Sequence, residues 1–387
     1  MIPIETVAQN TAVQAALATF PEIVPQIVEQ TIAIQQIPAP TFAEAKRAAY
    51  VQKRFAEVGL VEVAQDGLHN VYGRFPGSAP TKQLPVIISA HTDTVFPAST
   101  DLTVRREPPL YHGPGIGDNS TGVAGLLALA EALRVHEIRP LADIWFVANV
   151  GEEGLGDLRG MRAVVERFGG NAIYLVLEGG LFGQISHQAI GVRRYEIEIR
   201  TPGGHSWGNF GQRSAIHELG HLIVAIDKLQ VPANPKTTFN VGVIEGGTSI
   251  NTIAQSAKML LDLRSEDPEQ LAGLVAEVEK LVRRCQKRAN VSVQMTQIGS
   301  RPAGWLEREA PLVQQAVAAL RYVGCSQISF IASSTDANIP LSKGYTAVCL
   351  GLTESSNAHR LDEYMDSSHL AAGISQTLLL ALSAAGL

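Results

Sequence analysis

The chain has 387 residues, 45% of them hydrophobic, and a formal net charge of −6 at pH 7. Its length exceeds the size at which single hydrophobic cores stop growing, so two domains are expected. The acidic charge balance offers no basic surface to nucleic acid or to an anionic membrane, and neither is expected as a partner.

The N-terminal segment and the cysteines bear on the compartment. Residues 1–24 have no cationic start and carry Glu5 where a secretory signal needs an apolar stretch, so no signal peptide is predicted. The three cysteines are far apart without a C-x-x-C pair, which predicts neither disulfides nor a cysteine zinc site. We find no apolar run of about 18 residues that would predict a membrane span. A cytoplasmic protein is expected.

The first part of the chain has the pattern of an α/β domain. Residues 21–60 read as helical with a break at 38–40, and residues 123–135 read as a helix that Asn119 or Ser120 would cap. Short apolar runs that predict buried strands cover residues 84–90, 144–150 and 172–177. This alternation predicts a mostly parallel sheet.

From Gly191 onward the strands alternate polar and apolar residues, which is typical of a half-exposed sheet. The expected ferredoxin-like order of strand, helix, strand, strand, helix and strand covers residues 192–201, 213–228, 238–245, 255–264, 268–288 and 290–297. A helix at 310–323 and an apolar strand at 346–352 then return to the first pattern. We therefore predict a catalytic domain formed by residues 1–190 and 301–387, with residues 191–300 inserted as an α+β domain.

Residues that commonly bind metal ions follow the predicted strands of the first domain or lie near them. They are His91 with Asp93, Asp118, Glu152 with Glu153, Glu178 and His359. Because open α/β sheets place ligand sites at the carboxyl ends of their strands, we expect these side chains to share one cleft. Two histidines and three carboxylates, with a further Glu and Asp beside them, suit two divalent ions and a general base. The sequence predicts a dinuclear metallohydrolase.

The first ion would be held by His91, whose other ring nitrogen needs an acceptor. Asp93 suits that duty, which keeps it out of coordination. Asp118 has two oxygens and suits a bridge between ions about 3.5 to 4 Å apart. Glu178 would complete the first ion. Two divalent ions and three carboxylates leave a net positive charge, which favours loss of a proton from water and stabilises an oxyanion.

The second ion would be held by His359 and one of two adjacent glutamates. We assign Glu153 as the ligand and Glu152 as the general base that moves a proton from water to the leaving nitrogen. The reverse assignment fits the sequence equally well, because the two residues are neighbours.

A competing motif lies in the inserted domain. Residues 217–221, His-Glu-Leu-Gly-His, match HExxH, the signature of single-zinc metalloproteases. Residues 222–227 lack the continuation that supplies a further ligand in one such class. We interpret the match as a coincidence, with His217 and His221 as polar residues on an amphipathic helix or at a subunit interface. A single-zinc protease is a remote alternative.

Several sequence blocks together resemble the dinuclear zinc amidohydrolase family that includes glutamate carboxypeptidase, peptidase T, acetylornithine deacetylase, succinyl-diaminopimelate desuccinylase and aminoacylase. The blocks are SAHTDTV, GIGDNSTGVAGLLALAEAL, GEEGLG, DANIPLSKGYTAVCLGL and NAHRLDEY. The resemblance spans nearly the whole chain and implies a zinc-peptidase-like fold with two zinc ions, cobalt and manganese being other candidates. It also implies a cis peptide after Asp118, and it favours Glu152 as the base and Glu153 as the ligand.

The same resemblance implies that the inserted domain is a lid and dimerisation domain. His205, in the block TPGGHS, would reach the active site of the partner subunit in a homodimer, where it would face an oxyanion. Asn251 and Arg264 match positions that contact the substrate carbonyl or carboxylate in relatives, and arginine pairs bidentately with carboxylates.

The resemblance leaves the substrate class open. At the position of Glu178, peptidases of this family tend to carry Asp and deacylases Glu, whereas the block GGHSWGNF is similar to that of peptidase-type members. The first hypothesis is hydrolysis of a small peptide beside a free carboxylate, by an exopeptidase or dipeptidase. The second is an N-acyl amino acid deacylase with the same mechanism. An inactive binding homologue is a third, and the intact set of ligand residues argues against it.

Overall fold

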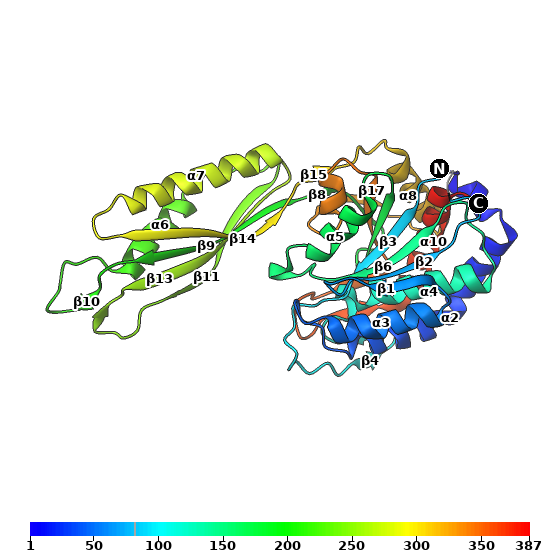
Figure 1. The fold of residues 1–387 in the computed structure, drawn as a ribbon, viewed down its shortest axis with the longest axis horizontal. Coiled ribbons are helices and arrows are strands. Elements are labelled where there is room, and N and C mark those ends of the chain that lie inside the picture. The colour runs from blue at the N-terminus through cyan, green and yellow to red at the C-terminus, as the bar shows by residue number, and fades with distance from the viewer. Residues whose placement is uncertain (81–82) are drawn as a thin grey trace. The chain divides into compact units, whose positions relative to one another are not determined.

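The chain divides into two units in the computed structural model, which describes residues 1–80 and 83–387. The first unit combines Met1–Ala189 with Trp305–Leu387, and the second is Ile190–Gly304. Each unit has a sheet and a hydrophobic core of its own. Figure 1 labels the helices and strands of both.

Four parallel strands form the centre of the nine-stranded sheet in the first unit. In spatial order they are β6 (Ile144–Asn149), β3 (Val86–His91), β7 (Ile173–Glu178) and β17 (Ala347–Gly351). Nearly all their side chains are buried, because both faces of the sheet are covered, and this explains the continuous apolar runs in the sequence. The predicted α/β class with a mostly parallel sheet is confirmed.

Outer strands of mixed direction extend this central sheet. They are β1 (Val61–Gln65), β2 (Val71–Phe75), β8 (Gln184–Ala189), β15 (Gly304–Trp305) and β16 (Ser329–Ser333). A separate four-stranded sheet pairs segments that are distant in the sequence, in the order β18 (Glu354–Ser356), β19 (Tyr364–Asp366), β5 (Leu110–His112) and β4 (Arg105–Glu107). This small sheet joins the segment before Asp118 to the segment after His359.

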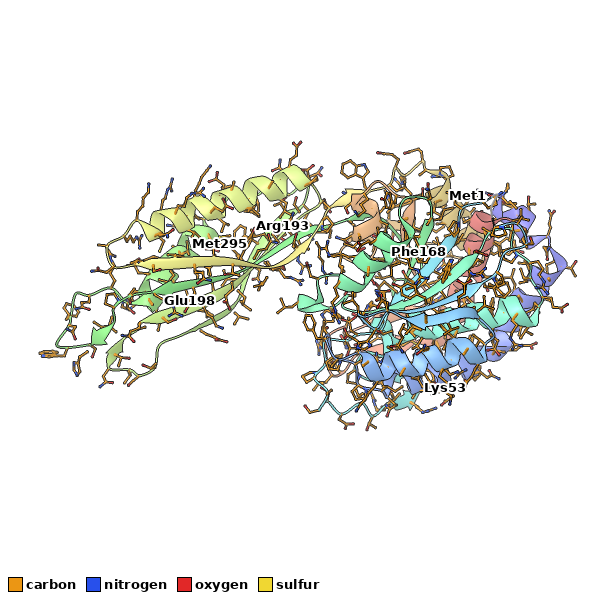
Figure 2. All side chains as sticks on the ribbon, viewed as in Figure 1. Met1, Lys53, Phe168, Arg193, Glu198 and Met295 are labelled. Carbon is orange, nitrogen blue, oxygen red and sulfur yellow. The ribbon has the colours of Figure 1, made fainter. Side chains whose placement is uncertain are left out.

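Two cores cover the central sheet, because alternate residues of each strand face opposite sides. Ile88 and Phe146 belong to the core shared with α1 (Ile4–Ala8), α2 (Thr11–Gln35), α3 (Ala45–Glu57), α4 (Thr121–Val135), α8 (Pro311–Tyr322) and α10 (Leu370–Ala385). Ile87 and Trp145 belong to the core shared with α5 (Arg159–Phe168) and α9 (Asn338–Ser342). There Phe168, labelled in Figure 2, packs on Trp145 with ring centroids 5.3 Å apart.

The N-terminal helices differ from the prediction. Helix α2 begins at Thr11 instead of Pro21 and runs through Pro21 and Pro25. The side chain of Asn10 caps it by accepting the N–H groups of the residues at positions 12 and 13. Each proline removes one backbone donor, and packing of α2 against α4 and α10 outweighs that loss. Helix α1 was not predicted.

The C-terminal helix α10 corrects the expectation that the chain has no long apolar run. Residues Ser367–Ala385 are long and apolar enough to cross a membrane by length and composition, but 78% of the apolar window is buried inside the protein. Helix α10 packs against α8, α2 and α1. We therefore assign it to the core of the first unit.

The second unit is an antiparallel sheet in the order β11 (Thr237–Gly246), β13 (Ser256–Ser265), β9 (Gly191–Arg200) and β14 (Ser292–Arg301). Helices α6 (Ala215–Asp227) and α7 (Pro268–Gln286) pack on one face and share its core (Figure 1). A short extension pairs β10 (Gly204–His205) with β12 (Thr252–Ile253). The chain order of strands and helices is the ferredoxin-like one.

Candidate metal centre

The candidate ligands begin at one edge of the central sheet. His91 is the last residue of β3, Glu178 is the last residue of β7, and Glu152 and Glu153 follow the end of β6. Because β6, β3 and β7 are parallel neighbours, their carboxyl ends lie at the same edge. The four side chains that follow or end these buried apolar strands therefore lie at the same edge of the central sheet.

Asp118 lies between two imidazoles. Its Oδ1 is 3.1 Å from Nε2 of His91, and its Oδ2 is 3.2 Å from Nε2 of His359. Each oxygen of this carboxylate thus faces a different histidine. The peptide bond from Asp118 to Asn119 is cis, as the family resemblance implied.

Two further carboxylates complete two groups of three around Asp118. Glu178 Oε2 lies 3.7 Å from Nε2 of His91, and Glu153 Oε1 lies 3.2 Å from Nε2 of His359. Ligand atoms of His91, Asp118 and Glu153 all lie within 4.8 Å of one another. The His91 side chain is 1% exposed and that of His359 is 55% exposed, so the cluster opens to solvent on the side of His359.

Asp93 holds the backbone of the two adjacent glutamates. Its Oδ1 accepts the N–H of Glu152 and its Oδ2 accepts the N–H of Glu153, both at 3.0 Å. The Nδ1 atom of His91 lies 3.1 Å from the main-chain oxygen of Asp93 and 3.6 Å from its Oδ1, which leaves Nε2 directed at Asp118. Asp93 therefore contacts the His91 ring and the glutamate pair together.

Arg47 binds the backbone between His91 and Asp93 and was not predicted from the sequence. This arginine is 2% exposed, and its guanidinium donates to the carbonyl oxygens of Thr92 at 2.8 Å and of Ile37 at 2.7 Å. Burial lowers the pKa of Arg47 to about 10, while the nearby Asp93 carboxylate raises it. A lone arginine on a helix pattern gave no signal that it would lie inside the protein.

The carboxylates of the cluster lie close together, so positive charge beside them would stabilise their ionised forms. Burial raises the pKa of Glu153 to about 8 and that of Glu178 to about 7. Burial also opposes ionisation of Asp118, but hydrogen bonds with His359 and His91 outweigh it and hold the Asp118 pKa well below its ordinary value. Hydrogen bonds with Asp118 and Glu153 raise the pKa of His359 to about 10. Protons thus neutralise the crowded carboxylates, and divalent ions suit the same nitrogen and oxygen donors.

Two buried carboxyl groups beside the cluster were also missed. Asp336 is fully buried, burial raises its pKa to about 8, and its Oδ2 accepts from Nδ2 of Asn149 at 2.6 Å. Glu363 is 1% exposed and accepts backbone N–H groups from the loop that leads to Asp118. Both lie in blocks that look like family motifs, but their side chains act on segments far away in the sequence.

The expected substrate-contacting residues lie in the second unit. His205 on β10 is exposed, and its Nδ1 accepts the backbone N–H groups of Trp207 at 3.2 Å and Gly208 at 3.3 Å. Asn251 lies beside it, because its main-chain oxygen accepts the N–H of Ser206 at 3.0 Å. With Nδ1 serving as an acceptor, the other ring nitrogen of His205 carries the proton in the neutral ring.

Arg264 lies far from His205 within this unit. On β13, Ser256 pairs with Arg200 and Arg264 pairs with Val192, so the arginine is near the opposite end of the strand. At about 3.4 Å per residue, eight residues span roughly 27 Å. The Nε atom of Arg264 donates to Asp262 at 2.8 Å. The structure therefore places Asn251 beside His205 and separates Arg264 from both.

The HExxH residues do not assemble a metal site. Glu218 is 3% exposed and its carboxylate pairs with Arg213 at 2.6 Å and with Arg288. His217 and His221 are exposed on α6. Among residues 1–80 and 83–387, the one group of three metal-binding side chains within reach of an ion is that of His91, Asp118 and Glu153. Glu218 thus has the contacts of a structural ion pair.

Comparison with known proteins gives a family match and distant relatives. Residues 87–383 match the model of peptidase family M20/M25/M40. A probable carboxypeptidase of Arthroderma otae is 25% identical over 251 residues, which are 57% of this chain and 52% of that protein. The uncharacterized protein YqjE of Bacillus subtilis is 26% identical over 272 residues, 66% of this chain and 70% of that protein. The chain spans about half the length of the fungal relative.

Solved structures share the fold over nearly the whole chain. A tripeptidase from Staphylococcus aureus has a TM-score of 0.80 at 20% identity and covers 94% of this chain and 98% of its own. Aminopeptidase PepT from Bacillus cereus has a TM-score of 0.76 at 22% identity and covers 94% of this chain and 99% of its own. At these identities the likeness concerns the fold alone.

Proposed function

The chain belongs to peptidase family M20/M25/M40, and on this premise we propose that it hydrolyses an amide or peptide bond in a small substrate that bears a free carboxylate. The reaction is that of an exopeptidase or dipeptidase. The observation that carries the proposal is Asp118, whose two oxygens each face a different imidazole. A carboxylate shared between two sets of nitrogen and oxygen donors suits a two-metal hydrolase.

Two zinc ions are the proposed cofactors, with cobalt or manganese as other candidates. His91 and Glu178 would hold one ion, His359 and Glu153 would hold the other, and Asp118 would be shared between the two groups. When bound, such ions polarise the scissile carbonyl group and lower the pKa of the attacking water.

Glu152 is the proposed general base, and Asp93 is the residue that positions it. Glu152 is 5% exposed and adjacent to the ligand Glu153, and its backbone N–H is held by Asp93. From that position its carboxylate takes the proton of the attacking water and delivers it to the leaving nitrogen. The hydrogen bond to Asp93 limits the movement of the glutamate pair, so the base stays aligned through the transfer.

The second unit is proposed to be a lid and dimerisation domain. Its His205 has an exposed ring whose Nδ1 is already an acceptor, so the other ring nitrogen presents an N–H to an oxyanion in the partner subunit. Asn251, beside His205 in the β10–β12 extension, contacts the substrate in the same proposal. Trp207 and Phe210, 88% and 91% exposed, support an interface around this loop.

Arg264 is the proposed partner of the substrate carboxylate. Its side chain is 42% exposed, and one guanidinium nitrogen already pairs with Asp262, which leaves further donors for a bidentate contact. Since Arg264 lies near the end of β13 that is remote from His205, we propose that the two residues serve different active sites of a homodimer.

An N-acyl amino acid deacylase is the second candidate function. It is favoured by Glu178, because the deacylases of this family tend to carry Glu at this position. The proposed compartment is the cytoplasm, supported by the three unpaired cysteines, Cys285, Cys325 and Cys349.

A substrate panel separates these candidates. Purified protein is incubated with dipeptides, tripeptides and N-acetyl amino acids, before and after chelation and after zinc is restored, and free amine is measured. Preferred cleavage of short peptides supports the first function, and preferred cleavage of N-acetyl amino acids supports the second. Turnover that resists complete metal removal contradicts the metal mechanism, and no turnover on any substrate supports an inactive homologue.

A further inference from the structure

Glu363 is a buried carboxylate bound to the backbone of the loop that carries Asp118. Its Oε1 accepts the N–H groups of Gly117 at 2.8 Å and Asp118 at 2.9 Å, and its Oε2 accepts the N–H of Gly115 at 2.9 Å. Its main-chain oxygen accepts the N–H of Gly113 at 2.9 Å. These four hydrogen bonds join one residue to the whole segment from 113 to 118.

Glu363 is also fixed relative to His359, four residues earlier. The turn between them is closed by backbone hydrogen bonds from Arg360 to Asn357 at 3.0 Å and from Glu363 to Arg360 at 3.1 Å. Directly after Glu363, β19 pairs with β5, with Tyr364 opposite the residue at position 112. The small sheet therefore brings the two segments together, and Glu363 adds a hydrogen bond to the backbone N–H of Asp118 itself.

We infer that Glu363 is a positioning residue that sets the separation between Asp118 and His359. It acts through the backbone of the Asp118 loop and touches neither the substrate nor an ion. The inference rests on the proposed metal centre, in which Asp118 and His359 hold the same ion. The observed distance of 3.2 Å between Oδ2 of Asp118 and Nε2 of His359 is the one that Glu363 maintains.

The chemistry of the contact requires a carboxylate. Three N–H donors converge on two oxygens, and an ionised carboxylate accepts such bonds more strongly than a neutral group does. Glutamine has the same shape but only one oxygen, so its amide N–H₂ would face at least one backbone N–H. Because both Glu363 oxygens are occupied by the loop, Glu363 is not expected to act as a ligand itself.

The loop has little room to adjust if this contact is lost. A Cβ atom on Gly117 would lie 2.6 Å from Cβ of Ser355 and 3.3 Å from Oε1 of Glu363. Gly115 has a φ of 71°, which favours glycine. An alanine at position 117 would therefore push the loop away from Glu363 while leaving the carboxylate in place.

The test measures zinc affinity by competition with a chromophoric chelator, together with the visible spectrum of the cobalt-loaded protein. Glu363→Gln is expected to weaken zinc binding about 10- to 100-fold, the usual effect of losing a residue that orients a ligand. It is also expected to change the cobalt spectrum. Gly117→Ala is also expected to weaken zinc binding and to change the cobalt spectrum. It tests the inference if Glu363→Gln does not fold.

The matched control is Glu218→Gln in the second unit, a carboxyl group of similar burial that binds two arginines. It is expected to lower the melting temperature and to leave zinc affinity and the cobalt spectrum unchanged. If folded Glu363→Gln or Gly117→Ala matches wild type in both metal measurements, the inference is wrong although the metal centre stands. If the wild-type protein binds no zinc, the proposed function fails and the inference fails with it.

Discussion

Asp93 and Glu152 are joined by a hydrogen bond of 3.0 Å from the backbone N–H of the glutamate to Oδ1 of the aspartate. The other oxygen of Asp93 accepts the N–H of Glu153 at the same distance. One buried carboxylate thus fixes the proposed base and a proposed ligand together. Sequence reasoning assigned Asp93 to His91 alone, because the contact with the glutamate pair crosses from β3 to the segment after β6.

Replacing Asp93 with Asn is expected to lower kcat/KM about 10- to 100-fold, because one backbone N–H of the glutamate pair would then face an amide donor. Steady-state kinetics and metal content of the purified variant measure this. Asp267→Asn is the control, since Asp267 accepts the N–H of Gln270 at the start of α7 and lies in the second unit. Equal activity of Asp93→Asn and wild type would show that the hydrogen bonds do not align the pair.

The adjacent glutamates are expected to respond differently. Glu152→Gln should lower kcat by about 10² to 10⁴ through loss of the general base, with metal content retained. Glu153→Gln should lose metal, because Glu153 faces His359. Metal analysis and kinetics of both variants decide the assignment, and the opposite pattern would mean that Glu152 is the ligand.

Metal removal is expected to lower the melting temperature, more strongly as pH rises. In the metal-free protein burial raises the pKa of Glu153 to about 8 and of Glu178 to about 7, above the ordinary value of 4.5. Their contribution to stability is therefore present below about pH 4.5 and is lost as pH rises to 7 or 8. Bound ions would favour the ionised carboxylates instead.

Calorimetry with and without chelator between about pH 6 and 8 measures this difference. We expect the gap between loaded and metal-free melting temperatures to widen with pH. A gap that stays constant would mean that these two carboxyl groups do not titrate in the metal-free protein.

His217→Ala is expected to leave activity and metal content unchanged, because His217 is exposed and Glu218 is bound by two arginines. Steady-state kinetics and metal analysis of this variant are compared with those of Glu152→Gln. Loss of metal and activity in His217→Ala, with activity retained in Glu152→Gln, would favour the single-zinc alternative.

His205 is expected to act in the partner subunit. His205→Ala and Glu152→Gln should each be nearly inactive, but mixed dimers contain one site with both residues intact. Under random assortment the mixture should recover about a quarter of wild-type activity. Subunits are mixed after dissociation and assayed, and no recovery in verified mixed dimers would mean that His205 acts within its own chain. A fully active His205→Ala variant would mean that His205 has no part in the reaction.

The sequence predicted the parts of the fold that depend on local patterns. Continuous apolar runs predicted β3, β6 and β7, because both faces of these strands are buried, and the residues at their ends were brought together as expected. Helix α4 was predicted with either Asn119 or Ser120 as its cap, and only Asn119 makes the capping hydrogen bond. Asn119 accepts the N–H of Gly122, whereas the Ser120 hydroxyl donates to a carbonyl oxygen.

What the sequence did not predict depends on distant contacts. Helix α2 continues through Pro21 and Pro25 because of its packing, which no local rule includes. Arg47 and Glu363 look like ordinary surface charges in the sequence. Each is buried because it binds backbone groups of a segment far away in the chain.

The most direct test of the account is a zinc titration of the metal-free protein, followed by calorimetry and metal analysis, in wild type and in Asp118→Asn. The wild type is predicted to bind two ions per chain, and Asp118→Asn is predicted to lose at least one of them together with activity, since both groups share the Asp118 carboxylate. A wild type that is fully active with a single ion, or an Asp118→Asn variant that keeps both ions and full activity, would contradict it.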